Sequence, residues 1–150
     1  MKLAEALQER ADLNTRIAQL RSRIENNVLV QEGEKPAEDP SELLSEHDVC
    51  VARLNELITR INLTNCSTVV GGRTLTELIS ERDVLKLKIR TYRDVICSAS
   101  QTAHRATHSE IKILSAIDVR TLQKKCDAMS KQLRETDNLI QQTNWTTELK

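Results

Sequence analysis

Two histidines, His104 and His108, are four residues apart, which is one helical turn, and Glu110 follows two residues later. Imidazole nitrogens at this spacing on one helix face can bind a metal ion, and a carboxylate is a common third ligand. The zinc-protease motif requires Glu directly after the first His, whereas Arg105 occupies that position here. His104, His108 and Glu110 are therefore the candidates if a metal site exists, and no metal is expected.

A basic cluster comprises Lys86, Lys88, Arg90 and Arg93. Helical periodicity places residues 86, 90 and 93 on one face, where they could contact a few phosphate groups. The alternative is a solvated face with partners one turn away, such as Arg90 with Asp94. The 22 basic residues are balanced by 22 acidic ones, so no nucleic-acid partner is expected. A nucleic-acid-binding helical arm is kept as an alternative function.

The sequence contains no motif of a known catalytic or nucleotide-binding site. The patterns G-x-S-x-G, G-x-x-x-x-G-K-[ST] and G-x-G-x-x-G do not occur, and neither does an EF-hand loop. The carboxylates lie on helix faces that should be hydrated, so none is an evident general acid. We therefore predict no catalytic residue, no cofactor and no enzyme activity.

The four cysteines, Cys50, Cys66, Cys97 and Cys126, are widely spaced and form no CxxC pair. Three of them, Cys50, Cys97 and Cys126, fall on apolar helical positions, where a reduced thiol acts as a small hydrophobe. A disulfide or metal role is the alternative. The spacing predicts neither a zinc ribbon nor the disulfide framework of a small secreted domain.

The elements that would position these side chains follow from composition. The 150 residues include 19 Leu, 11 Ile and 9 Val but no Phe, one Tyr and one Trp, and Gly and Pro together number five. This profile argues against nucleic-acid-binding modules that use aromatic residues and against Gly-rich nucleotide-binding loops. It is typical of long helices that pack through a stripe of aliphatic residues, which we call a seam. We therefore predict an all-α fold.

Apolar residues recur at alternating steps of three and four, which is the heptad pattern of helices that pack along their length. The pattern predicts four long helices in antiparallel, coiled-coil-like hairpins, and an acidic loop between the first two. The helices are expected at residues 2–30, 40–64, 75–106 and 118–143, and the loop at 31–39. Residues 1–150 are expected to form a single helical domain.

Two short segments have an extended pattern. Thr68–Val70 precedes a double glycine, and residues 111–116 alternate apolar with other side chains. We expect these two segments to pair as a two-stranded β element, within one subunit or between subunits.

Burial argues for a homo-oligomer. Narrow apolar stripes make a thin core, and a third helix of about 48 Å would be longer than an ordinary 150-residue globule is wide. Packing between subunits would cover the remaining apolar seam. The expected core or interface residues lie on the third and fourth helices and on the tail. They are Leu75, Leu78, Leu85, Ile89, Tyr92, Ile96, Leu122, Met129, Leu133, Ile140 and Trp145.

Several segments together resemble a family of small bacterial proteins that is labelled septicolysin or a domain of unknown function. The resemblance covers the whole chain and implies a helical protein without established catalytic residues. Taken literally, the label implies a cytolysin-like, membrane-active protein, which is a further alternative function. The segments are Ile17–Asn27, Gln31–Pro40, Gly72–Ile79, Ser109–Lys112 and Asn144–Leu149.

The prediction from sequence is a non-catalytic, oligomerising scaffold or interaction protein. Its expected partner is a second copy of itself, and any other protein partner is unknown. No apolar run approaches the ~20 residues of a membrane span, and acidic residues interrupt the first segment where a signal peptide would be apolar. We therefore expect a cytoplasmic protein without a membrane partner.

Overall fold

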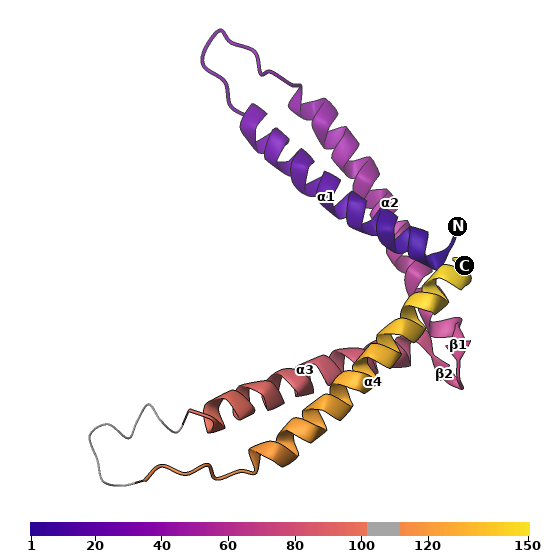
Figure 1. Cartoon of the computed structure of the whole chain (residues 1–150). Helices are drawn as coiled ribbons and strands as arrows, with labels where there is room; N and C mark the ends of the chain where they lie inside the picture. Colours follow the sequence, from indigo (N-terminus) through magenta and orange to yellow (C-terminus); the bar gives the residue numbers. More distant parts are fainter. Residues whose placement is uncertain (102–111) are drawn as a thin grey trace. The chain divides into compact units, whose positions relative to one another are not determined.

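The computed structural model describes residues 1–101 and 112–150. In these residues the chain forms four helices and one small β-hairpin, which confirms the predicted all-α class (Figure 1). The elements are α1 (Leu3–Asn27), α2 (Pro40–Ser67), β1 (Val69–Val70), β2 (Arg73–Thr74), α3 (Leu75–Ala99) and α4 (Val119–Thr146).

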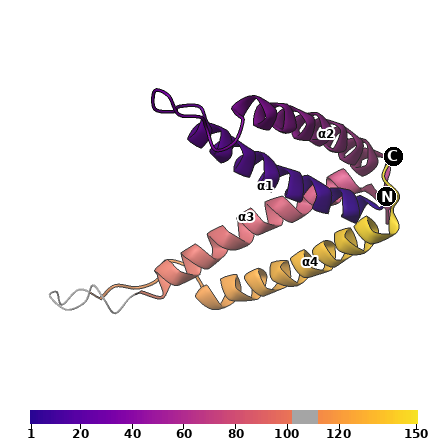
Figure 2. The same ribbon diagram turned by 90° about the horizontal axis from the view of Figure 1, so that it is seen from above.

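The chain divides into two compact units. The first unit comprises Met1–Thr74 with Thr143–Lys150, and the second comprises Leu75–Gln142. Within the first unit α1 and α2 run side by side, and within the second α3 and α4 do so (Figure 2). The expectation of a single domain stays a prediction.

The first unit is an antiparallel hairpin of α1 and α2 around an aliphatic core. Leu20 on α1 and Leu43 and Cys50 on α2 are buried and form one cluster. Leu13 and Ile17 pack against this cluster from α1. Residues spaced by seven along each helix therefore meet across the hairpin, as the heptad pattern requires.

The start of α2 follows from local chemistry. Asp39 precedes Pro40, which is the first helical residue and whose missing N–H would have no helical partner there. The Asp39 carboxylate accepts a hydrogen bond of 2.8 Å from the backbone N–H of Ser41. Helix α2 therefore begins at residue 40, where the sequence predicts.

Helix α1 ends at Asn27, before the predicted residue 30. Val28, Leu29 and Val30 are 54%, 88% and 52% exposed. Their side chains are therefore not buried in a way that would stabilise a longer helix. The Asn27 side chain instead donates to the Arg23 carbonyl and accepts from the backbone N–H of Glu38. These bonds end the helix and turn the chain into the loop.

Helix α2 continues to Ser67, beyond the predicted residue 64. Thr64 is fully buried, and its hydroxyl donates to the Arg60 carbonyl at 2.8 Å. The backbone N–H of Thr68 donates to the Thr64 carbonyl at 2.9 Å, which completes the last turn. A polar side chain whose hydroxyl forms a hydrogen bond within its own helix can thus lie in the buried seam, and the helix continues past it.

The β element forms a tight hairpin. Val69 pairs with Thr74, and Val70 pairs with Arg73. The two loop residues, Gly71 and Gly72, have φ values of +59° and +79°, a left-handed conformation that favours glycine. The predicted location of the first strand is confirmed at β1.

The predicted partner of that strand, residues 111–116, is wrong. The two-glycine turn brings Arg73 and Thr74 back alongside β1, so the strand pairs with its neighbour in sequence and not with a distant segment. Residue 111 lies outside the described residues, and no strand forms within residues 112–116.

The two chain ends pair within the first unit. The backbone N–H of Leu3 donates to the Thr147 carbonyl, and that of Leu149 donates to the Met1 carbonyl, each at 2.9 Å. The Lys150 N–H donates to the Thr64 hydroxyl at 3.0 Å. The tail after α4 therefore ties the start of α1 to the end of α2.

Helix α3 ends at Ala99, whereas the sequence predicts residue 106. Its last three residues, Cys97, Ser98 and Ala99, have small side chains, and the Ser100 hydroxyl and N–H both donate to the Ile96 carbonyl. Its 25 residues give a length of about 37 Å, not 48 Å. Residues 102–106 lie outside the described part of the chain.

Helix α4 begins at Val119 and ends at Thr146, so it continues past the predicted residue 143. Asp118 caps it, since its carboxylate accepts from the Arg120 N–H at 3.0 Å and from the Thr121 hydroxyl at 2.6 Å. Its last turn is fixed because Thr143 and Asn144 are buried.

Candidate functional site

Ion pairs close one flank of the α1–α2 hairpin. Arg53 Nε lies 2.7 Å from Glu9 Oε1, and Arg16 Nη2 lies 2.6 Å from Glu46 Oε1. A third cross-hairpin pair joins Arg23 to Glu38. On α1 these residues, 9, 16 and 23, are seven apart, so they form one row beside the buried seam. We call this row and its partners the ionic flank.

The ionic flank lowers the pKa of its carboxyl groups. The hydrogen bond from Arg53 is the main reason that the pKa of Glu9 lies below its usual value. The pKa of Glu38 is lowered in the same way by Arg23. Because each guanidinium stabilises the charged carboxylate, these pairs stay ionised at neutral pH and fix the register of α1 against α2.

The opposite flank of the same hairpin has an apolar row on α2. Leu44, Val51 and Ile58 are seven residues apart and are 48%, 42% and 40% exposed. Ile17 and Ile24 on α1 are only partly buried on this side of the seam. We call Leu44, Val51 and Ile58, with their half-buried neighbours, the open flank.

A small, mainly apolar hollow of about 210 Å³ confirms that the two helices meet on the open flank. It is lined by Arg21, Ile24 and Glu25 from α1 and by Leu44 and His47 from α2. The His47 side chain is 30% exposed, and its Nδ1 lies 3.4 Å from Asp48 Oδ1. The hairpin therefore has one flank covered by ion pairs between its two sides and one flank on which an apolar row is accessible.

A second groove lies within the unit formed by Leu75–Gln142. Lys86, Arg90 and Arg93 from α3 line it together with Arg134 from α4. Three of the four predicted phosphate-contact residues thus meet, whereas Lys88 does not line the groove. Sequence reasoning missed Arg134, because only the antiparallel pairing of α3 with α4 places it opposite the α3 cluster. That pairing is marked by a hydrogen bond of 2.8 Å from Gln132 to Glu81.

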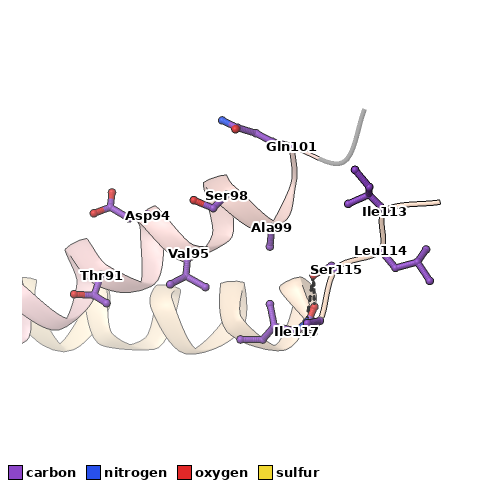
Figure 3. Close-up of a pocket in the computed structure, with 11 residues that line it drawn as sticks. Thr91, Asp94, Val95, Ser98, Ala99, Gln101, Ile113, Leu114, Ser115 and Ile117 are labelled. Atoms are coloured by element: carbon purple, nitrogen blue, oxygen red, sulfur yellow. Dashed lines mark hydrogen bonds between the residues drawn. The ribbon is translucent and has the colours of Figure 1, made fainter. Parts of the chain in front are cut away.

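A larger hollow of about 660 Å³ lies between the end of α3 and the segment before α4. Asp94 is the one ionisable side chain among the described residues that line it. Figure 3 shows Asp94 and Gln101 pointing away from Ile117, while Val95 points toward it. The Ser115 hydroxyl donates to the Ile117 carbonyl at 2.7 Å, so this hydroxyl is engaged in the local turn. The hollow brings together no nucleophile–base pair in the described part of the chain.

The predicted core or interface residues differ in burial within the single chain. Leu75, Leu78, Leu85, Ile89 and Ile140 are buried. Tyr92, Ile96, Leu122, Met129 and Leu133 are partly buried. Trp145 is 63% exposed, so it is not part of the core of this chain, and its place in an interface stays a prediction.

The candidate metal ligands His104, His108 and Glu110 lie outside the described residues. Within residues 1–101 and 112–150, no three His, Cys, Asp or Glu side chains gather as a metal site. Cys50 and Cys126 are buried free thiols, as the apolar pattern predicts, whereas Cys97 is exposed. The described helices include none that is both long and apolar enough to cross a membrane.

Comparison with known proteins places the chain in a family. The model of a family of unknown function, DUF6847, matches residues 10–149. A solved structure, described as that of a functionally unknown conserved protein from Corynebacterium diphtheriae, has a TM-score of 0.93 and 39% sequence identity. The match covers 100% of this chain and 99% of that one. No curated protein matches the chain.

These matches correct the resemblance drawn from the sequence. Neither the family description nor that of the similar structure includes the septicolysin label. A resemblance in short segments such as Ile17–Asn27, which lies in α1, can indicate a fold but does not establish an activity. The label is therefore wrong for this chain, and the matches give no support to the cytolysin reading that depended on it. The chain belongs to the family of unknown function DUF6847.

Proposed function

We propose that the protein is a non-catalytic helical module that associates with a second copy of itself through the open flank of the α1–α2 hairpin. The observation that carries this proposal is the row of Leu44, Val51 and Ile58, exposed at seven-residue intervals beside a complete seam. Seven-residue apolar spacing on a helix surface is the pattern that a further helix can pack against, as in coiled coils.

The size of this face supports self-association. A 25-residue helix is about 37 Å long, and two packed helices are about 20 Å wide, so the hairpin presents a face of roughly 700 Å². A standard protein–protein interface buries about 800 Å² on each partner. The hairpin face that carries the open flank is therefore close in size to one side of a standard interface.

The symmetry of the row also supports a second copy as the partner. The side chains at its two ends, Leu44 and Ile58, have similar size and lie equally far along α2 from Val51. Two such rows that run antiparallel can pair Leu44 with Ile58 of the second copy and Val51 with its own equivalent. This is the self-complementary arrangement that a two-fold dimer requires.

Two further parts of the proposal concern chemistry and compartment. We propose that the protein acts by binding alone, since the faces of the α1–α2 hairpin are built from aliphatic side chains and paired charges. We also propose a cytoplasmic location, which is supported by the buried free thiols of Cys50 and Cys126. Reducing compartments keep such thiols from pairing.

Sedimentation velocity at micromolar concentrations tests the proposed association. The L44E/V51E variant places two charges on the open flank and should sediment as a monomer, with a dissociation constant raised at least about a hundredfold. V49E is the matched control, because Val49 is also on α2 and 67% exposed but lies about 140° around the helix from Leu44. A wild-type protein that is monomeric at these concentrations would refute self-association.

A further inference from the structure

The groove between α3 and α4 has a volume of about 550 Å³ and a strongly basic lining. Lys86, Arg90 and Arg93 come from one face of α3, and Arg134 comes from α4. All four are exposed. Asp94 is the single acidic residue of the lining, so the formal charge of the groove is +4 − 1 = +3.

These cations lack the counter-charges that arginines have elsewhere in the chain. In the first unit Arg16, Arg23 and Arg53 each have a carboxylate within hydrogen-bond distance. Among the described residues, no carboxylate forms an ion pair with any of the four groove cations.

The nearby acidic residues are engaged elsewhere. Asp137 lies 3.9 Å from Arg82, and Glu135 lies 3.9 Å from Lys131. Glu81 accepts a hydrogen bond from Gln132. None of these acids pairs with a groove cation, and Asp94, the acid of the lining, forms no ion pair with them among the described residues, so a net positive charge remains in the groove.

The arrangement disfavours the folded unit electrostatically. Lys86 and Arg90 are four residues apart, and Arg90 and Arg93 are three apart, so like charges are neighbours on the α3 surface. The fold then adds Arg134 from the opposite helix. The repulsion among these cations does not stabilise the α3–α4 pair, whereas a bound anion would attract each of them.

We propose that this groove binds a small ligand that carries two or more phosphate groups. The α3 cations extend over seven residues, or about 10 Å, which exceeds what one phosphate needs. Guanidinium groups present paired N–H donors that match phosphate oxygens, and Lys86 adds a point charge. Ser130, which also lines the groove, supplies a hydroxyl donor from α4.

The groove favours a small polyphosphate over a nucleic-acid strand. Its volume is within the range of about 300–1,000 Å³ that is typical of small-molecule sites. Binding of single strands usually adds stacking of bases on aromatic side chains. Tyr92 is the one aromatic residue between Leu75 and Gln142, and it is partly buried in the helix seam.

Isothermal titration calorimetry with inorganic tripolyphosphate, in about 20 mM salt, tests this proposal. The full-length protein should bind it, and R90A and R134A should each weaken binding at least about tenfold. K88A is the matched control, since Lys88 is a basic residue of α3 about 200° around the helix from Lys86. Its affinity should stay within about twofold of the wild type.

Thermal unfolding provides a second measurement that does not depend on the heat of binding. Tripolyphosphate should raise the midpoint for the wild type and K88A but not for R90A, because ligand binding stabilises only a competent folded state. Circular dichroism without ligand should show equal helix content in all variants, since the substituted side chains are exposed.

Three outcomes would overturn the proposal. Wild-type protein that does not bind tripolyphosphate would remove the site. Equal weakening by K88A and R90A would show that only the overall charge matters. Binding of a 20-residue thymidine oligonucleotide that depends on Arg90 and Arg134, without binding of tripolyphosphate, would assign the groove to a nucleic-acid backbone instead.

Discussion

Arg53 on α2 binds Glu9 on α1 through two hydrogen bonds, with Nε 2.7 Å from Oε1 and Nη2 3.1 Å from Oε2. Arg53 also donates to Glu56 on its own helix at 2.8 Å. This bidentate pair joins residues 44 positions apart and fixes α1 against α2 on the ionic flank. Because ion pairs cover that side of the hairpin, the proposed association uses the apolar side.

Removing the Glu9 carboxylate should destabilise the hairpin through this contact. We expect E9Q to lower the thermal midpoint by roughly 2–5 °C, since Arg53 then loses its main partner on α1. R53M should have a similar effect, and E9Q/R53M should cost less than the sum of the two. Thermal unfolding followed by circular dichroism measures all four forms. Additive effects would show that the pair is not coupled.

Stability should fall in acid because of the same flank. The pKa values of Glu9 and Glu38 are lowered in the folded state, mainly by hydrogen bonds from Arg53 and Arg23. A lowered carboxyl pKa contributes stability above the unfolded value, which is near 4.5, and that stability is lost as pH falls through the folded pKa.

Urea unfolding at a series of pH values checks this expectation. The midpoint should be nearly constant from about pH 7 to pH 5 and should decrease below about pH 4.5. The decrease should be smaller for E9Q/E38Q, which lacks both titrating groups. An equally steep decrease in that variant would assign the acid sensitivity to other carboxylates.

The buried seam should dominate the stability of the first unit. Leu57 is completely buried, so L57A should cost about 2–5 kcal/mol in the free energy of unfolding. V49A, on the same helix but 67% exposed, should change it by less than about 0.5 kcal/mol. Equilibrium urea denaturation measures both. Similar losses in the free energy of unfolding for L57A and V49A would mean that Leu57 does not belong to the buried seam.

The hairpin loop should tolerate only residues that adopt a positive φ. G72V should cost about 1–2 kcal/mol, because Gly72 has φ +79° and a β-branched side chain is strained there. G71N should be milder, since Asn accepts the left-handed conformation of Gly71 at φ +59°. Thermal unfolding of the two variants compares them. Equal thermal midpoints for G72V and G71N would mean that the turn does not require a residue that readily adopts a positive φ.

The sequence predicts the helices well because their signals are local. Heptad spacing, Pro40 after Asp39, and Asp118 before Val119 each act within a few residues of where they occur. Helix ends were less accurate, since the end of α1 depends on a bond from Glu38 to Asn27 across the loop. A contact of this kind has no periodic signature in the sequence.

The candidate surfaces were predicted only in part. The α3 cations are visible as a sequence cluster, whereas Arg134 joins them through the pairing of two helices. Leu44, Val51 and Ile58 recur at seven-residue intervals in the sequence, but only the three-dimensional structure shows that ion pairs cover the other flank and that this row is exposed. Sequence periodicity gives the apolar face of a helix but does not show which part of that face its neighbour covers.

Photo-crosslinking between isotopically distinct copies tests the central claim of self-association through the open flank most directly. A photoreactive residue is placed at position 51, or at position 49 as the control, in a mixture of light and heavy chains. We predict that position 51 yields light–heavy cross-links whose second end maps to α1 or α2, and that position 49 does not. Cross-links from position 51 that join residues of a single chain only, for example to α3 or α4, would contradict the claim.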